Sequence, residues 1–445
     1  ARKDQKPGPF SPMNLQGCSQ LWFDPILRSR AESFACVQIL YRHRLEFFDA
    51  DGDGVTARVE NLESGEELTF RAEYMAGCDG AASTIRRGLG IQDLGTHVLS
   101  SALHVFFRAP RVFEKMGVEP AVFFAAVDQS GYWGNIRIVD PADGLWRILF
   151  DVPPGFDPQS LDYARCLRRS FAKEIDVEWV GASKWTRRGV VAEKYSVDRV
   201  YLAGDSVHQV SPTGALGMNT GIGDAVDLGW KIAARYHGWG GAGLLGSYSL
   251  ERQPVGARNV DMSTKYYEGQ AQFRDGLDGV EDPTPHGDEV RAAVAASVLA
   301  HVTRMFATLG LQIGYRYEKS PICVPDDTPP GADDPATYQP STRAGSRAPH
   351  VRLADGRSTL DLFGRGFVLL RLGDAYSGGE AIEAEARRQG VPLRTHAFGD
   401  PELARIYEKT FVLVRPDGHV AWRGDEMPAD MYALIARVRG SASSR

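Results

Sequence analysis

Residues 199–233 carry the strongest chemical signal in the chain. A β-favouring run, Val200-Tyr201-Leu202-Ala203, ends at Gly204-Asp205 and leads through a proline- and glycine-rich turn to a helical pattern that begins near Gly217. This order places the Asp205 carboxylate in a loop that runs into a helix N-terminus. Unpaired N–H groups and a positive partial charge at such an end attract electron-rich ligand atoms. The alternative is an ordinary strand, loop and helix in which Asp205 only caps the helix.

A second pattern lies upstream, at residues 74–87. Gly77 and Gly80 would let the backbone pass close to a ligand, Asp79 could accept hydrogen bonds from hydroxyl groups, and Arg86 could meet phosphate charge. An Asp-Gly pair after a strand is by itself more often a plain turn. The pair gains weight because it precedes the Gly204-Asp205 segment in the same chain.

In this order the two patterns resemble the Asp-Gly fingerprint and the second FAD-binding motif of single-component, FAD-dependent aromatic hydroxylases of the phenol type. The resemblance covers about residues 18–254 and 345–425. It implies that Gly204-Asp205 meets a ribityl hydroxyl of FAD and that Asp79, Gly80 and Arg86 lie where FAD and the pyridine nucleotide bind. It also implies that the loop and the helix start face the flavin ring, through Pro212, Gly214, Gly217, Met218 and Asn219.

The resemblance implies a monooxygenase that uses FAD, NAD(P)H and O2 to hydroxylate a phenolic substrate through a flavin C4a-hydroperoxide. His208 and Pro212 are the candidate catalytic residues. A histidine beside such a turn more often bonds to the loop than acts as a base, and His104 and Arg108 are weaker candidates. Two alternatives remain: another flavin oxidoreductase on the same scaffold, and a non-catalytic fragment or binding subunit.

Enzymes of this family begin with a βαβ unit that carries GxGxxG on its first turn. Residues 1–12 are instead rich in proline and lysine, and the pattern at residues 238–243 follows a helical segment, so it reads as a loop. We therefore expect the first βαβ unit to be absent and the cofactor site to be incomplete.

Composition narrows the function classes. With 51 Lys and Arg against 57 Asp and Glu, a formal charge of −6 argues against general nucleic-acid binding. No apolar run approaches the roughly 18 residues of a membrane helix and the start lacks a signal-peptide core, so we expect a cytoplasmic protein away from the membrane. The five cysteines have no metal-site spacing. Residues 49–60 fit the EF-hand expression, but strand-like flanks favour a hairpin tip, so no metal site is predicted.

The expected fold class is α/β with α+β elements. A Rossmann-like FAD-binding domain takes residues 1–97 and 186–275, and residues 98–185 form an antiparallel substrate domain with strands at 101–108, 121–127, 131–139 and 145–150. Residues 18–34 suggest a strand and a helix, residues 37–76 a β-meander, and residues 276–340 a helical segment and linker. Residues 341–445 resemble the thioredoxin-like domain of phenol-type hydroxylases; without cysteine we expect it to be structural, with a homodimer interface as one alternative.

Overall fold

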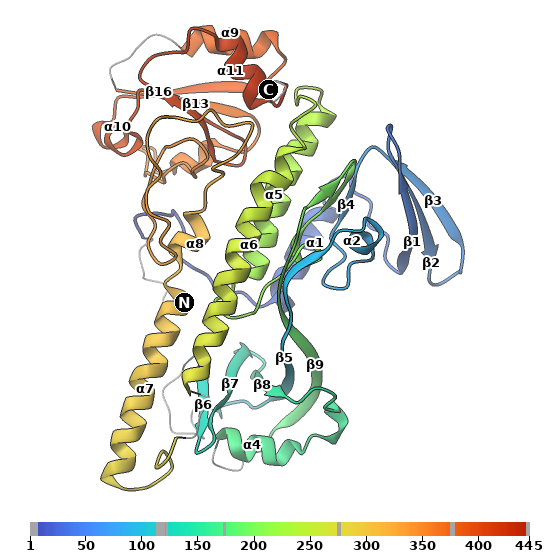
Figure 1. Ribbon diagram of the computed structural model, residues 1–445, viewed down its shortest axis with the longest axis vertical. Coiled ribbons are helices and arrows are strands. Elements are labelled where there is room, and N and C mark those ends of the chain that lie inside the picture. The colour runs from blue at the N-terminus through green and yellow to red at the C-terminus, as the bar shows by residue number, and fades with distance from the viewer. Residues whose placement is uncertain are drawn as a thin grey trace.

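The computed structural model describes residues 8–112, 121, 123–171, 175–273, 277–373 and 379–441. Two long helices, α5 (Gly217–Tyr236) and α6 (Ser247–Glu268), run through the middle of the molecule. A C-terminal domain lies at one end of them and a six-stranded sheet at the other, with the segments that carry the two motifs at the side (Figure 1). Most of the predicted residues 1–12 segment lies outside the described residues.

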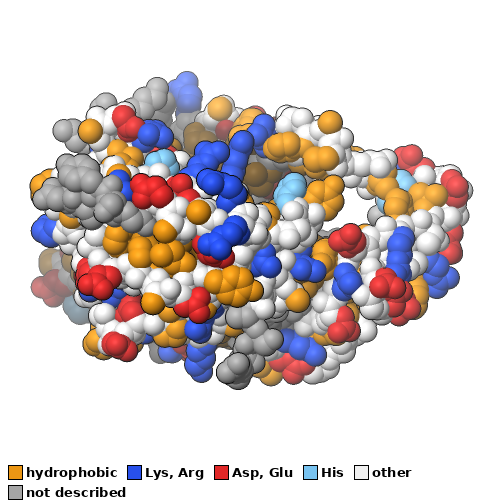
Figure 2. Space-filling view, turned by 90° about the horizontal axis from the view of Figure 1, so that it is seen from above, with side chains coloured by type: hydrophobic (Ala, Val, Ile, Leu, Met, Phe, Trp, Pro, Cys, Tyr) orange, Lys and Arg blue, Asp and Glu red, His pale blue; other side chains and the backbone are white. Residues whose placement is uncertain are grey.

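The predicted β-meander is confirmed. It consists of β1 (His43–Ala50), β2 (Val55–Asn61) and β3 (Glu67–Ala72), paired antiparallel. At the β1–β2 turn the Asp51 carboxylate accepts hydrogen bonds from the N–H groups of Asp53 (2.8 Å) and Gly54 (2.9 Å) and from Arg71 (2.7 Å). The residues that fit the EF-hand expression therefore close a hairpin, as expected. In Figure 2 the lobe formed by β1, β2 and β3 lies at the right, with an opening between it and the main body.

A small mixed sheet brings the two motifs together. Strand β4 (Met75–Gly77) pairs in parallel with β11 (Val200–Leu202), and β10 (Ser196–Val197) completes the order β10-β11-β4. All three β11 residues are buried, and Ile85 of α2 (Thr84–Gly88) shares their core. Because parallel strands end at the same edge of a sheet, Gly80 and Gly204 follow neighbouring strand ends. The expectation of an absent first βαβ unit stays a prediction.

The predicted antiparallel sheet is confirmed, with more strands than expected, and its role as the substrate domain stays a prediction. Its order is β12-β9-β5-β8-β7-β6, formed by β12 (His208–Gln209), β9 (Glu178–Ala192), β5 (Asp93–Arg108), β8 (Leu145–Val152), β7 (Gly131–Asp140) and β6 (Phe123–Asp128). Helix α4 (Tyr163–Phe171), which follows the turn η1 (Pro158–Ser160), packs on one face against Leu103, Val105 and Ile148. Strands β5 and β9 span the boundaries expected at 97/98 and 185/186, so they join the two bodies continuously.

The N-terminal helix corrects one expectation. Ser19 accepts a hydrogen bond from the Leu21 N–H, and α1 (Gln20–Glu32) begins directly after it, so the predicted entry strand is wrong. A serine N-cap at this point favours the helix over an extended start. None of the α1 residues is buried.

The helical segment after α6 contains η3 (Gly269–Phe273), α7 (Pro285–Phe306) and α8 (Leu309–Ile313). The stretch Pro285–Ile313 has the length and mean hydropathy (1.4) of a membrane span, so the expectation that no run approaches this limit is wrong by that criterion. One such helix is weak evidence for a membrane, because core helices of other proteins pass the same test.

The C-terminal domain is a four-stranded sheet of order β14-β13-β15-β16. A parallel pair, β13 (Phe367–Leu372) and β14 (Leu393–Phe398), is joined through α9 (Gly379–Arg388). The antiparallel pair β15 (Phe411–Val414) and β16 (Val420–Gly424) and helix α11 (Met431–Val438) follow. Two short helices complete it, η4 (Thr359–Leu362) and α10 (Pro401–Tyr407).

The sequence GxGxxG at residues 238–243 is a loop, as expected. It connects α5 to α6, and the N–H of Gly241 donates to the carbonyl of Arg439 (2.6 Å). A Cβ on Gly241 would lie 2.4 Å from the backbone of Gly440. Its glycines thus permit a close backbone crossing with the C-terminal domain, and the pattern is no phosphate loop.

Candidate active site

The site is built at the end of β11. Gly204 has φ +65°, and a side chain on Gly221 of α5 would come within 3.2 Å of its Cα, so the helix and the turn touch backbone to backbone. The Ser206 hydroxyl donates to the carbonyls of Gly77 and Ala203, both at 2.8 Å. These bonds tie the end of β11 to the end of β4 and hold Asp205 at the surface between them.

A buried carboxylate on α5 holds this turn in place. Asp224 of α5 accepts hydrogen bonds from the Gly204 N–H (3.1 Å), from His208 Nε2 (2.8 Å) and from Arg252 Nε (2.8 Å). Burial alone would raise the pKa of Asp224, but Arg252 and His208 outweigh it and lower the pKa. The Asp224 carboxylate is therefore ionised and orients the Gly204-Asp205 turn.

The structure places His208 in the core. Its side chain is fully buried, and one ring nitrogen bonds to Asp224. Such a residue touches neither solvent nor an accessible surface, so the geometry favours the loop-bonding alternative over the catalytic one. Pro212, the other catalytic candidate, is exposed in the loop before α5.

The start of α5 offers open N–H groups. Leu216 is the N-cap residue and makes no capping hydrogen bond with its side chain, while Met218 and Asn219 are exposed. The Asn219 side chain turns back to the carbonyl of Ala215 (3.0 Å), which has φ +56°. The first turn of α5 therefore presents backbone donors and the positive end of the helix dipole at the surface. Gly217 is the first residue of this helix.

The upstream motif braces the turn. Asp79 accepts hydrogen bonds from Ser83 Oγ (2.6 Å) and Ile85 N (3.0 Å), next to Gly80 with φ +74°. Arg86 is buried, donates to the carbonyl of Ser206 (2.7 Å) and pairs with Asp93 (2.8 Å). Its guanidinium is occupied within the protein, so its position favours linking the two motifs over the phosphate contact expected from the sequence.

Behind the site lies a group of fully buried charges that the sequence reading missed. We name it the buried charge cluster: Asp227, Lys231, Glu251, Arg415 and Asp417. Arg415 of the C-terminal domain reaches between α5 and α6 to Asp227 (3.0 Å) and Glu251 (2.6 Å). The available signal was the spacing of Asp227 and Lys231, four residues apart, which places a carboxylate and an ammonium group on one face of the helix.

The buried charge cluster gives a pH prediction. Burial raises the pKa of Asp227 to about 7, and the neighbouring Glu251 charge adds to the effect against the attraction of Lys231. The folded protein then holds a proton that the unfolded chain releases near pH 4, so this group's contribution to stability falls as pH rises from about 4 to about 7. Several histidines have lowered pKa values, among them His104, His301 and His419. Their contribution to stability rises with pH, because the unfolded chain binds more protons than the folded protein.

We therefore expect the wild type to lose on the order of 1–2 kcal/mol relative to Asp227→Asn between pH 5.5 and 7.5. Urea unfolding of both proteins at each pH measures this difference and cancels the histidine contribution. The control is Asp261→Asn, which breaks an exposed pair with Lys265 on α6 and should leave the pH dependence unchanged. Parallel pH profiles of wild type and Asp227→Asn would contradict the assignment.

Comparison with known proteins bears on this geometry. The family profile described as "FAD binding domain" matches residues 2–263, and that described as "Aromatic-ring hydroxylase, C-terminal" matches residues 341–442. The 4-methyl-5-nitrocatechol 5-monooxygenase of Burkholderia sp is 31% identical over 458 residues, which cover 96% of this chain and 78% of that protein. The 2,4-dichlorophenol 6-monooxygenase of Cupriavidus pinatubonensis is 28% identical, with 98% of this chain and 80% of that protein covered.

Solved structures agree. The rebeccamycin biosynthetic enzyme RebC with reduced flavin superposes with a TM-score of 0.89 at 36% identity, covering 99% of this chain and 81% of RebC. Aklavinone-11 hydroxylase with FAD and aklavinone gives a TM-score of 0.79 at 30% identity, covering 97% of this chain and 79% of that chain. The resemblance inferred from the sequence is confirmed: the chain belongs to the FAD-dependent monooxygenases that join an FAD-binding domain to an aromatic-ring hydroxylase C-terminal domain.

Proposed function

We propose that this aromatic hydroxylase acts on a phenolic ring, either of a simple phenol or of a fused, polyketide-like aromatic, with FAD, NAD(P)H and O2. Two relatives are named for a nitrocatechol and a dichlorophenol, and a third is solved with aklavinone. These names support the substrate class. They leave the ring position and the choice between NADH and NADPH open.

One observation carries the assignment of the flavin site. Asp205 is exposed, and no hydrogen bond or ion pair engages its carboxylate among the described residues. It stands beside Gly204, where no atom of the described residues, its chain neighbours aside, lies within 4 Å of the point that a Cβ would occupy. A free carboxylate next to an uncapped helix start fits a ligand that has hydroxyl groups on one part and electron-rich ring atoms on another.

The residues present therefore fit the ribityl and ring portions of FAD. We propose that Asp205 accepts hydrogen bonds from the ribityl hydroxyls and that the first N–H groups of α5, at Gly217, Met218 and Asn219, face the electron-rich edge of the ring. Gly214, with φ +90°, and Pro212 form the loop that leads into this turn. When bound, FAD supplies the reducing and oxygen-transferring chemistry.

The chain's own residues hold the loop of the site in place. We propose that His208, Asp79, Gly80 and Arg86 act as supports of the loop, because each is engaged inside the protein or shapes a turn. The thioredoxin-like C-terminal domain has no cysteine, so we assign it a structural role. The ion pairs that Arg415 of this domain forms with Asp227 of α5 and Glu251 of α6 support that role.

The test is spectroscopic and kinetic. Because the cofactor site is expected to be incomplete, FAD is supplied in excess, and the purified chain should perturb the flavin absorption spectrum. A panel of phenols and hydroxynaphthalenes should then stimulate NAD(P)H oxidation and yield hydroxylated product by mass spectrometry. Stimulated oxidation that yields only hydrogen peroxide with every phenol would contradict a phenolic substrate.

A further inference from the structure

The face of the six-stranded sheet opposite α4 carries cations without matching carboxylates. Strand pairing places Arg137 of β7, Arg147 of β8 and Phe106 of β5 in one row, and Asn135, Leu149 and His104 in the next. Directly paired residues share a face of the sheet. The apolar core with α4 uses the alternate residues, such as Val105 and Ile148, so these two rows lie on the other face.

Arg147 is the unusual member. Its Nη2 donates to Asn135 Oδ1 at 3.3 Å, while its Nε is buried and has no hydrogen-bond partner among the described residues. Neither Arg147 nor Arg137 has a carboxylate within ion-pair distance in the described part of the chain. Burial, and then the nearby Arg137 charge, lower the pKa of Arg147 to about 10. A half-satisfied, desolvated guanidinium is costly unless an anion completes it.

Other arginines of the same sheet show what is missing. Arg108 pairs with Asp143 (2.7 Å) and Glu178 (2.9 Å), and Arg187 pairs with Asp151 (2.9 Å). Arg108 and Arg187 are therefore each neutralised by a carboxylate of the protein itself. At Arg147 the described part of the sheet supplies the amide of Asn135 and no carboxylate, which leaves the Nε of the guanidinium without a partner there.

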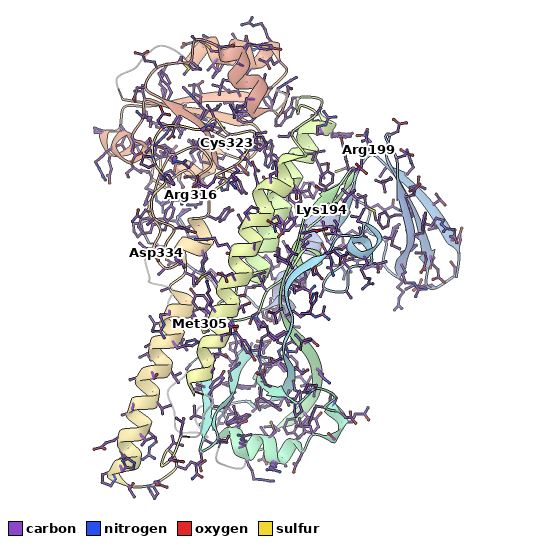
Figure 3. The ribbon with its side chains drawn as sticks, in the orientation of Figure 1. Lys194, Arg199, Met305, Arg316, Cys323 and Asp334 are labelled. Atoms are coloured by element: carbon purple, nitrogen blue, oxygen red, sulfur yellow. The ribbon has the colours of Figure 1, made fainter. Side chains whose placement is uncertain are left out.

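This face also borders the flavin loop. Phe123 and Ala125 of β6, which pair with Arg137 and Asn135, line a small apolar cavity together with Met305 of α7. The Met305 carbonyl lies 3.6 Å from the point where a Cβ on Gly214 would stand. Figure 3 shows Met305 near the C-terminal end of α7. The row of Arg147 and the loop of Gly214 therefore approach the same region from two sides.

Aromatic and neutral polar groups complete the surface. The ring of His104 lies 5.9 Å from that of Phe106 and 5.5 Å from that of Trp185. Burial, with Arg147 and Arg187 nearby, lowers the pKa of His104 to about 4, so it is neutral at pH 7, and its Nε2 is buried without a partner among the described residues. Such a surface suits a flat aromatic ring with a polar edge.

We propose that Arg147, assisted by Arg137 and Asn135, binds a carboxylate substituent of the aromatic substrate. This inference rests on the proposed function and narrows its substrate class to aromatic acids. A carboxylate is favoured over a phenolate because it is charged at pH 7, whereas a phenol with a pKa near 10 is neutral. Its two oxygens also match the planar fork of a guanidinium.

The test compares two probes of the same shape, 1-hydroxy-2-naphthoate and 1-hydroxy-2-naphthamide, by titration calorimetry of the full chain with FAD in excess. The wild type should bind the acid about 10- to 100-fold more tightly than the amide. Arg147→Met should remove this preference and leave the amide affinity within about threefold, and Arg147→Lys should restore part of it. The control Arg108→Met, which loses a carboxylate-paired arginine of the same sheet, should keep the preference.

Equal affinities in the wild type, failure of both probes to bind, or a preserved preference in Arg147→Met would each overturn the carboxylate site. Circular dichroism of the variants confirms that they are folded. The enzyme could oxidise NAD(P)H and form product with 1-naphthol and the amide, yet bind the acid no more tightly than the amide. This result would overturn the carboxylate site and leave the proposed function standing. If the chain bound the acid more tightly than the amide but hydroxylated none of the probes, the proposed function would be overturned and the carboxylate site would stand.

Discussion

Replacement of Arg415 by methionine should lower the free energy of unfolding by about 3–5 kcal/mol, the cost typical of removing one partner from a buried ion pair. Arg415 is fully buried and binds Asp227 (3.0 Å), Glu251 (2.6 Å) and Asp417 (2.6 Å). Without it, Lys231 is left to pair with Asp227 (2.7 Å) and Glu251 (2.5 Å), while Asp417 keeps His419 at 3.5 Å and loses its arginine. Methionine fills much of the same space, so the loss reports the charge rather than a cavity.

Chemical denaturation with a domain-specific probe measures this effect. The control is Arg357→Met, which breaks an exposed pair with Asp355 in the same C-terminal domain and should cost under about 1 kcal/mol. Adding Glu251→Gln to Arg415→Met should recover part of the loss, because it removes one of the uncompensated carboxylates. The role of the cluster would be refuted if Arg415→Met cost no more than Arg357→Met.

The position of Arg415 also explains how the domains are coupled. It follows β15 in the C-terminal domain, yet its partners Asp227 and Glu251 lie on α5 and α6. Asp224, one helical turn before Asp227 on α5, holds the N–H of Gly204. Loosening the cluster should therefore shift the helix that positions the turn, and the C-terminal domain contributes to the site without contacting it.

The sequence predicted those parts of the molecule whose signals are local. The strand and turn at Gly204-Asp205, the helix after it and the β-meander each depend on neighbouring residues, and all three are present. The antiparallel sheet followed from alternating residues and turn signals in the same way. The entry strand failed because Ser19 begins a helix at that point, a capping effect that outweighs the residue pattern.

The contacts that decide the roles of individual residues are distant in sequence. Arg86 meets the carbonyl of Ser206 across 120 residues, and Arg415 meets Asp227 across 188. No local pattern reports such pairs, so the sequence suggested a phosphate contact for Arg86 and left His208 as a candidate base, with bonding to the loop as the more frequent role of such a histidine. The structure shows both engaged inside the protein, and it adds Asp224 and Arg252, which local patterns left without a partner.

Asp205→Ala should weaken FAD binding about 10- to 100-fold, the effect of losing one hydrogen bond to a charged group. The reason is that the Asp205 carboxylate has no partner among the described residues and stands beside the open turn at Gly204. For the same reason the thermal stability of the cofactor-free protein should not change. Quenching of flavin fluorescence during titration of the cofactor-free chain measures the dissociation constant.

Two further variants separate the site from general charge. Asp205→Asn keeps an oxygen acceptor and should lose less affinity than Asp205→Ala, because only the charge assistance is removed. Glu193→Ala removes an exposed carboxylate from the turn before β10 and should leave FAD affinity unchanged. If Asp205→Ala bound FAD as tightly as Glu193→Ala, the ribityl group would have to be held elsewhere. If Asp205→Ala instead destabilised the cofactor-free protein, Asp205 would be a structural cap, as the ordinary strand, loop and helix alternative requires.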